Sequence, residues 1–231
     1  MYDERLQQNL PRVEERIARA LARSGRSDGV RLIAVTKSHP AAAVTAAFRA
    51  GIRDVGENRV QELEEKRAEL GDGPGVWHLI GHLQRNKAKR AITLSDLIHS
   101  VDSHRLAQEL SKEAVKAGVS IRVLVQVNVS GEASKGGFDA ARAVSEISAV
   151  AELPGVVCEG LMTMAPLTDD EGAVRATFVG TRELLERCMA EGVPLQGREL
   201  SMGMSGDFEI AIEEGSTMIR LGTILFGERE P

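Results

Sequence analysis

The sequence predicts a parallel α/β protein whose strands close into a (β/α)8 barrel of the TIM type. Eight short apolar runs alternate with longer, charge-rich segments of helical period. The runs are rich in Val, Ile and Leu, which is typical of strands buried on both faces. The 231 residues suit one barrel, and the chain lacks the Gly-rich dinucleotide fingerprint that would favour an open sheet.

Residues 3–23 are predicted to form an amphipathic helix before the first strand, because their apolar residues share one stripe. The predicted strands that follow are 31–36, 52–55, 76–80, 97–101, 121–129, 156–162, 199–202 and 217–221. The helical segments between them are 40–50, 59–70, 103–117, 139–150 and 171–190. No Pro- or Ser-rich linker divides these units, so we expect one domain over residues 1–231.

Composition and charge exclude several classes of protein. The formal net charge of −5 argues against a surface that binds nucleic acid or an anionic membrane, and the basic run 85–90 (RNKAKR) is read as a solvated helix face. The N-terminus has no apolar core of a signal peptide, and no run approaches the length of a membrane span. The two cysteines, Cys158 and Cys188, are far apart, so we expect reduced thiols in a cytoplasmic protein.

Function in such a barrel gathers at the carboxyl ends of the strands, and the residues there are polar or glycine. The residues at these ends include Lys37–Ser38, Glu57–Asn58, Gly81–His82, Asp102–Ser103, Asn128, Thr163, Gly203–Ser205 and Arg220–Thr223. The pattern predicts a functional site on this rim of the barrel.

Lys37 directly follows the apolar run LIAVT, so its side chain is expected at the barrel mouth. Partial removal from water lowers the pKa of a lysine and frees its amine to attack an aldehyde. Position alone also fits a lysine that pairs with a carboxylate. The loops after the seventh and eighth strands must therefore help to decide.

Those two loops have the composition of a phosphate site. Glycines let backbone N–H groups approach an anion closely, and Ser205 and Thr223 add hydroxyl donors beside Gly222. Alternatively, Ser205 or Asp207 caps the helix that follows. Arg220, at the end of the last strand, is expected either beside a bound ring or in a salt bridge with a rim carboxylate such as Glu57 or Asp102.

Seven segments together resemble the pyridoxal phosphate homeostasis protein family (YggS/PROSC-like). They are AVTKSHP (34–40), GENRVQE (56–62), WHLIGHLQRNK (77–87), HSVDS (99–103), QVNVSGEASKGGF (126–138), GLMTMAP (160–166) and LSMGMSGDFEIAI…GSTMIRLGTILFGERE (200–230). The resemblance covers nearly the whole chain. Leu79 departs from it, because family members often carry Phe there.

The resemblance implies a fold-type III barrel like the N-terminal domain of alanine racemase, with pyridoxal 5′-phosphate (PLP) held as a Schiff base on Lys37. It also implies a phosphate held by Ser205, Gly222 and Thr223, an Arg220 that faces the pyridine nitrogen, and Asn58 near the cofactor. A guanidinium beside this nitrogen disfavours its protonation, which makes the ring a poor electron sink. The cofactor is thus expected in a form suited to carrying.

These expectations favour a PLP-binding protein of PLP homeostasis, with no catalytic residue assigned. The alternatives are a PLP-dependent amino-acid racemase, a class I aldolase-like Schiff-base enzyme and a partner-binding scaffold. Racemisation needs a second acid–base group, which in alanine racemases is a tyrosine of a second domain. The one tyrosine, Tyr2, is placed far from the rim, and His39 or His82 is the remaining candidate.

The expected partners are PLP and PLP-dependent apo-enzymes, and the missing racemase dimer contact favours a monomer. His78, His99 and His104 lie on separate segments, so no metal site is predicted.

Overall fold

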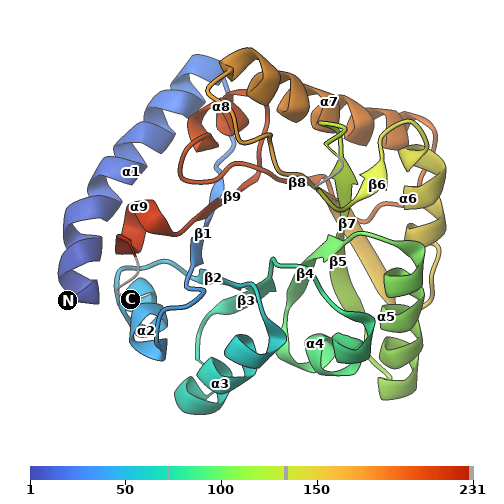
Figure 1. Ribbon diagram of the computed structural model, residues 1–231, viewed down its shortest axis with the longest axis horizontal. Helices are drawn as coiled ribbons and strands as arrows, with labels where there is room; N and C mark the ends of the chain where they lie inside the picture. The colour runs from blue at the N-terminus through green and yellow to red at the C-terminus, as the bar shows by residue number, and fades with distance from the viewer. Residues whose placement is uncertain (72, 133–134, 229–231) are drawn as a thin grey trace.

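The computed structural model describes residues 1–71, 73–132 and 135–228. Within these ranges, eight parallel strands close into a barrel around which the helices are arranged (Figure 1). The barrel strands are β1 (Arg31–Val35), β2 (Asp54–Glu57), β3 (Val76–Leu79), β4 (Leu97–Val101), β5 (Ile121–Asn128), β7 (Val156–Met162), β8 (Glu199–Ser201) and β9 (Met218–Leu221). The barrel closes because β1 pairs with β9 and β4 pairs with β5.

The predicted barrel and its extra N-terminal helix are confirmed. The helices are α1 (Tyr2–Ser24), α2 (Ala41–Arg49), α3 (Val60–Leu70), α4 (Ala88–Leu94), α5 (His104–Ala117), α6 (Ala143–Ala151), α7 (Glu171–Ala190), α8 (Phe208–Glu213) and α9 (Thr223–Phe226). A short 3₁₀ turn, η1 (Arg85–Lys87), precedes α4, and Arg85, Lys89 and Arg90 of this stretch are exposed, as predicted for a solvated helix face.

The differences from prediction are local. The second strand begins at residue 54 and not at 52, and α6 begins at residue 143 and not at 139. Residues 138–139 instead form β6 (Phe138–Asp139), which pairs with the end of β5 outside the ring of eight. A strand of two residues leaves too short a pattern to be read from sequence.

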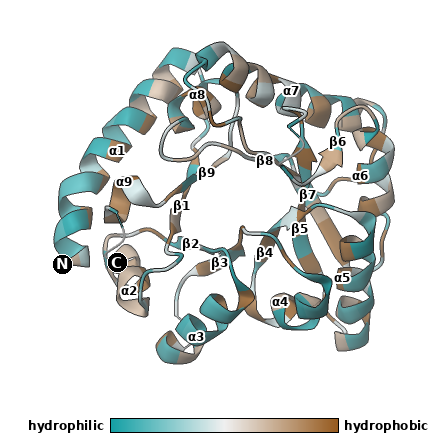
Figure 2. Cartoon of the chain, in the orientation of Figure 1, coloured by the Kyte–Doolittle hydropathy of each residue, from teal (hydrophilic) through white to brown (hydrophobic). Residues whose placement is uncertain are grey.

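Side-chain alternation along the strands separates an inner core from an outer one. Inside the barrel, an apolar cluster is formed by Ile33, Leu97, Leu124, Met162 and Met218. The alternate residues face outward into a larger cluster beneath the helices, whose apolar sides face the barrel (Figure 2). The inner cluster occupies part of the barrel, and buried polar side chains, among them His78, His99 and Ser201, occupy another part.

Helix α1 runs along the outside of α8 and α9 and ties the two ends of the barrel sequence together (Figure 1). Arg5 Nη1 donates to the carbonyl oxygen of Phe226 at 2.8 Å, and Asn9 Nδ2 donates to that of Leu225 at 3.0 Å. Arg16 stacks over the ring of Phe208 and contacts the Glu209 carboxylate at 2.7 Å.

In the part of the chain that the structure describes, no helix combines the length and apolar character needed to cross a bilayer. Cys158 and Cys188 are buried free thiols, which confirms the prediction of unpaired cysteines.

Candidate functional site

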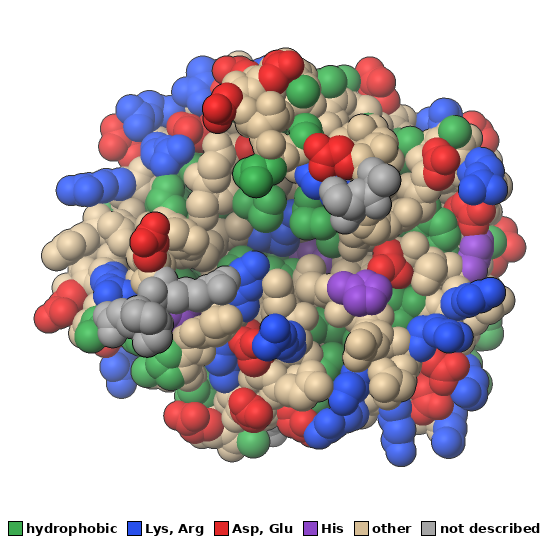
Figure 3. Space-filling model, viewed as in Figure 1, with side chains coloured by type: hydrophobic (Ala, Val, Ile, Leu, Met, Phe, Trp, Pro, Cys, Tyr) green, Lys and Arg blue, Asp and Glu red, His purple; other side chains and the backbone are tan. Residues whose placement is uncertain are grey.

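A cavity of about 640 Å³ opens at the carboxyl ends of the barrel strands. It is the hollow at the centre of the face in Figure 3, where basic and histidine side chains gather inside a partly hydrophobic rim. The six residues predicted for the site all line it: Lys37, Asn58, Ser205, Arg220, Gly222 and Thr223. Sequence positions nearly 190 residues apart are thus brought together because parallel strands end at the same rim.

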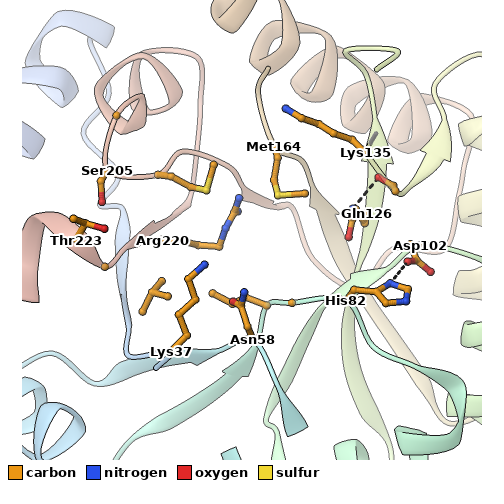
Figure 4. Close-up of a pocket in the computed structure, with 17 residues that line it drawn as sticks. Lys37, Asn58, His82, Asp102, Gln126, Lys135, Met164, Ser205, Arg220 and Thr223 are labelled. Carbon is orange, nitrogen blue, oxygen red and sulfur yellow. Dashed lines mark hydrogen bonds and ion pairs between the residues drawn. The ribbon is translucent and has the colours of Figure 1, made fainter. Parts of the chain in front are cut away.

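Lys37 follows β1 on a turn that is held from both sides. The carbonyl oxygen of Thr36 accepts a hydrogen bond from Lys66 Nζ at 2.7 Å, and the Ser38 N–H donates to Glu62 Oε2 at 2.7 Å. Ser38 has a φ of 61°, a left-handed conformation that is costly for a residue with a Cβ. These contacts fix the half-buried Lys37 side chain over the cavity, where it points toward the guanidinium of Arg220 (Figure 4).

The sequence predicted that Glu57 faces the rim, but the structure buries it beneath the Lys37 turn. Its Oε1 accepts hydrogen bonds from Lys66 Nζ and from the Thr36 hydroxyl, each at 2.6 Å. Desolvation raises the pKa of Glu57, although the Lys66 ammonium counteracts this effect. The pair therefore acts as a buried electrostatic clamp on the segment that carries Lys37.

Arg220 forms no salt bridge with the rim carboxylates named from the sequence. Its Nη1 donates to Ser201 Oγ at 2.7 Å and its Nη2 to the carbonyl oxygen of Thr163 at 3.0 Å. The salt-bridge expectation is wrong because Glu57 is bound to Lys66, and Asp102 accepts from His82 Nδ1 at 2.9 Å. Burial lowers the pKa of Arg220 to about 10, which still leaves the guanidinium charged at neutral pH.

The loops after β8 and β9 form one wall, on which Ser205 and Thr223 lie next to each other (Figure 4). The Ser205 and Gly206 amides lie in a turn outside any helix or strand, and neither donates a hydrogen bond within the described ranges. Thr223 begins α9, so its N–H has no acceptor inside the helix. A Cβ on Gly222 would lie 3.2 Å from the Val35 carbonyl oxygen, so the backbone passes close to β1 here.

The capping alternative for this loop is wrong. Asp207 is the residue before α8, but its side chain makes no capping hydrogen bond to the helix. Its Oδ1 instead accepts from the Met204 N–H at 2.5 Å and closes the turn that presents Ser205 and Gly206. The Asp207 carboxylate therefore stabilises the turn and leaves the Ser205 and Gly206 amides available to a ligand.

The opposite wall was only partly foreseen. His82 and Asp102 lie at predicted strand ends, and Gln126 is aligned by a hydrogen bond from its Nε2 to the carbonyl oxygen of Gly136 at 2.8 Å (Figure 4). The strand period could have indicated Gln126, which is two residues beyond the inward-facing Leu124. Lys135 also lines the cavity, and its Nζ donates to the carbonyl oxygen of Ala165. No signal in the sequence predicted Lys135 as a cavity residue.

Three rim residues named from sequence have other roles. Asn128 ties its own loop, with Nδ2 donating to the carbonyl oxygens of Glu132 and Lys135 at 2.9 and 3.1 Å. Ser103 precedes α5 without capping it, and Thr163 contributes its carbonyl oxygen to Arg220. These contacts support the wall without lining the cavity.

Tyr2 lies closer to the rim than its position in the sequence suggested. Its hydroxyl is 3.2 Å from His39 Nδ1, on the turn that follows Lys37, and its ring packs edge-on against Phe226. Neither Tyr2 nor His39 belongs to the cavity lining. Tyr2 thus lies on the outer side of the Lys37 turn and not on the side that faces the cavity.

Two of the histidines that are separate in sequence are in contact. His78 Nδ1 and His99 Nε2 are 2.8 Å apart inside the barrel. Among the described residues, no three His, Cys, Asp or Glu side chains gather as metal ligands.

Known proteins resemble this chain over nearly its whole length. The family model described as "Alanine racemase, N-terminal domain" matches residues 8–230. The pyridoxal phosphate homeostasis protein of Aquifex aeolicus is 42% identical over 225 residues, which cover 96% of this chain and 98% of that protein.

Solved structures agree with the sequence matches. PipY of Synechococcus elongatus, solved with PLP bound, is 43% identical with a TM-score of 0.81, and the match covers 91% of this chain and all of that one. Alanine racemase of Clostridium difficile is 16% identical with a TM-score of 0.75, and the match covers 94% of this chain but 57% of the racemase. The racemase shares the barrel fold.

Proposed function

The chain belongs to the pyridoxal phosphate homeostasis proteins, within the alanine racemase N-terminal domain family, and from this premise we propose that residues 1–231 form one PLP-binding domain that serves PLP homeostasis. In this proposal Lys37 holds PLP as a Schiff base. The observation that carries it is the meeting of three groups in one cavity: an amine on Lys37, a guanidinium on Arg220, and a loop wall with open amides at Ser205.

The residues present fit the chemical groups of PLP. Its phosphate suits the wall formed by Ser205, Gly206, Gly222 and Thr223, where N–H and hydroxyl donors gather without a carboxylate among the lining residues of that wall. The cavity of about 640 Å³ holds a ligand of this size with room to spare. Asn58, which lines the cavity beside Lys37, is proposed to contact the ring (Figure 4).

Arg220 is proposed to face the pyridine nitrogen and to keep it unprotonated. A guanidinium has only donors, and its charge disfavours a second positive charge beside it. When bound, PLP supplies an aldehyde for amines and an electron sink, and an unprotonated ring is the weaker sink. Lys37 and Arg220 thus favour holding PLP over carbanion chemistry.

Homeostasis further requires that PLP be released, and we propose PLP-dependent apo-enzymes as the recipients. Every group proposed to hold PLP comes from one chain, so the site is complete in a monomer. Size-exclusion chromatography with light scattering tests the monomer. Transfer is tested by mixing the PLP-loaded protein with an apo-transaminase and following the recovery of transaminase activity.

The attachment site is tested by borohydride reduction of the PLP-loaded protein followed by peptide mass mapping. We expect the phosphopyridoxyl mass on Lys37, and its loss in Lys37→Ala. Lys112→Ala, which changes an exposed lysine of α5, is the matched control and should be labelled as the wild type is. Label on another lysine in the wild type contradicts the assignment, and a colourless protein that takes no label favours the aldolase-like or scaffold alternatives.

One observation favours amino-acid racemisation as the second candidate. His82 Nδ1 is held by Asp102 on the wall opposite the phosphate loops, which places an acid–base group across the cavity from Lys37 (Figure 4). Sustained formation of a D-amino acid that disappears in both Lys37→Ala and His82→Ala would establish this activity. We expect no such turnover.

A further inference from the structure

A continuous chain of hydrogen bonds crosses the barrel interior from Asp54 to Arg220. His78 Nε2 is 2.9 Å from Asp54 Oδ1, and His78 Nδ1 is 2.8 Å from His99 Nε2. His99 Nδ1 is 2.8 Å from Ser201 Oγ, which accepts from Arg220 Nη1 at 2.7 Å. The five side chains come from β2, β3, β4, β8 and β9, so the chain runs from the amino ends of the strands to the cavity.

Water has little access to this chain, except at its far end. His78, His99 and Ser201 have no exposed surface, and Arg220 is 5% exposed. The Asp54 side chain is 16% exposed at the opposite face of the barrel. The two charges of the chain therefore lie at its ends, with neutral groups between them.

The chemistry of the two ends sets one direction for every bond between them. A guanidinium can only donate and an ionised carboxylate can only accept, so each donor must point toward Asp54. Ser201 then donates to His99 Nδ1, His99 Nε2–H donates to His78 Nδ1, and His78 Nε2–H donates to Asp54. Both rings are neutral Nε2–H tautomers in this arrangement, and each hydrogen bond between Arg220 Nη1 and Asp54 has one donor and one acceptor.

Other arrangements leave a group without a partner. A charged His78 would donate to His99 and reverse that ring, so the Ser201 proton would lose its acceptor among the described residues. Burial, together with the neighbouring His78 and Arg220, lowers the pKa of His99 well below its ordinary value, which agrees with a neutral ring. Burial lowers the pKa of Arg220, and the negative charge of Asp207 opposes this effect. The Asp207 carboxylate accepts its hydrogen bond from the Met204 N–H and is not a member of the relay.

We propose that Asp54, His78, His99 and Ser201 are positioning residues that fix the Arg220 guanidinium against the bound ring through this one-directional relay. The proposal rests on the proposed function, because the ring that Arg220 faces is that of PLP. The relay holds Nη1 through Ser201, while the Thr163 carbonyl holds Nη2. The orientation of Arg220, and with it the electronic state of PLP, then depends on residues that do not line the cavity.

The first test needs no PLP. Nitrogen-15 NMR of the five histidines, assigned by single His→Gln variants, reports which ring nitrogen carries the proton. We expect His78 and His99 as neutral Nε2–H tautomers at pH 7. A proton on Nδ1 of either ring, or a charged ring, contradicts the relay.

The second test compares two variants that each remove a buried serine hydroxyl. Ser201→Ala should weaken PLP binding roughly tenfold, because a hydrogen bond to a charged group is lost, and should shift the absorption maximum of bound PLP. Ser111→Ala removes a hydroxyl that bonds the Pro154 carbonyl oxygen on the outside of the barrel, and should leave both quantities unchanged. Ser201→Thr, which keeps the hydroxyl, should restore the wild-type spectrum.

The outcomes separate the two proposals. If the wild type binds PLP on Lys37 but Ser201→Ala matches Ser111→Ala in affinity and spectrum, the positioning role is wrong. If the wild type takes no label on Lys37, the proposed function fails and the positioning role fails with it. The NMR result still decides the direction of the hydrogen bonds in that case.

Discussion

Lys66→Met tests the buried clamp beneath the Lys37 turn. Glu57 is fully buried and the Lys66 side chain is 8% exposed, so water does not screen their contact at 2.6 Å. Methionine fills similar space without a charge, and leaves the Glu57 carboxylate with the Thr36 hydroxyl alone, since Glu57 Oε2 already lacks a partner. Breaking a buried pair in this way costs about 3–5 kcal/mol. In a chain of this length the cost corresponds to a decrease of about 6–20 °C in Tm.

The sign of the pH dependence follows from the pKa of Glu57. Burial raises this pKa in the folded protein, and loss of Lys66 removes the main opposing effect, so it rises further. The folded state then keeps a proton that the unfolded state releases. Stability is therefore retained at low pH and is lost as the pH rises from the ordinary carboxyl pKa through the folded one. The difference from the wild type should be smallest at acidic pH and largest near neutrality.

Urea unfolding followed by the fluorescence of Trp77, the single and buried tryptophan, measures this loss. Lys112→Met is the matched control, because Lys112 pairs with Glu109 on an exposed helix face, and it should leave the free energy of unfolding nearly unchanged. Adding Glu57→Gln to Lys66→Met should recover part of the stability, since the unpaired charge is gone. A loss below about 1 kcal/mol in Lys66→Met at pH 7, or a loss independent of pH, refutes the reasoning.

Three further predictions concern the barrel and its loops. Gly203→Ala should lower the free energy of unfolding by about 1–3 kcal/mol in thermal denaturation. The φ of Gly203 is 96°, and a new Cβ would lie 2.6 Å from a side-chain atom of α8. Gly206→Ala is the control and should not lower it, because a Cβ at Gly206 has no atom within 4 Å. Cys158, whose pKa burial raises to about 12, should resist a thiol reagent at pH 8 until urea is added. Asp207→Ala should weaken PLP binding about three- to tenfold in a fluorescence titration, because the bond that closes the turn at the Met204 N–H is lost.

The fold could be predicted from sequence because strand and helix periods are local properties. The eight strands and the long helices were found within a few residues, since their apolar runs exceed the length at which a period can be read. The two-residue β6 falls below that length. The positions of Lys37, Ser205 and Arg220 at strand ends followed from the topology, and the six predicted site residues meet in one cavity.

The sequence could not show contacts between side chains that only the folded chain brings together. Glu57 ends a strand as a rim residue does, yet Lys66 of α3 draws its carboxylate into the core. His78 and His99 are on different strands, and only the barrel register brings their rings within 2.8 Å. Tyr2 precedes every strand, and the docking of α1 carries it to His39.

The layered interior links the fold to the proposed function. The apolar cluster that includes Ile33 and Leu97 fills one part of the barrel, and the polar relay crosses the interior from Asp54 to the cavity. Arg220 is consequently held by Ser201 at the end of a hydrogen-bond chain that begins at Asp54, and no carboxylate among the described residues forms a salt bridge with it. A carboxylate beside the ring nitrogen would favour its protonation and strengthen the electron sink, whereas a guanidinium held from behind leaves the ring unprotonated. In the proposed arrangement the relay therefore favours the binding of PLP with little carbanion chemistry.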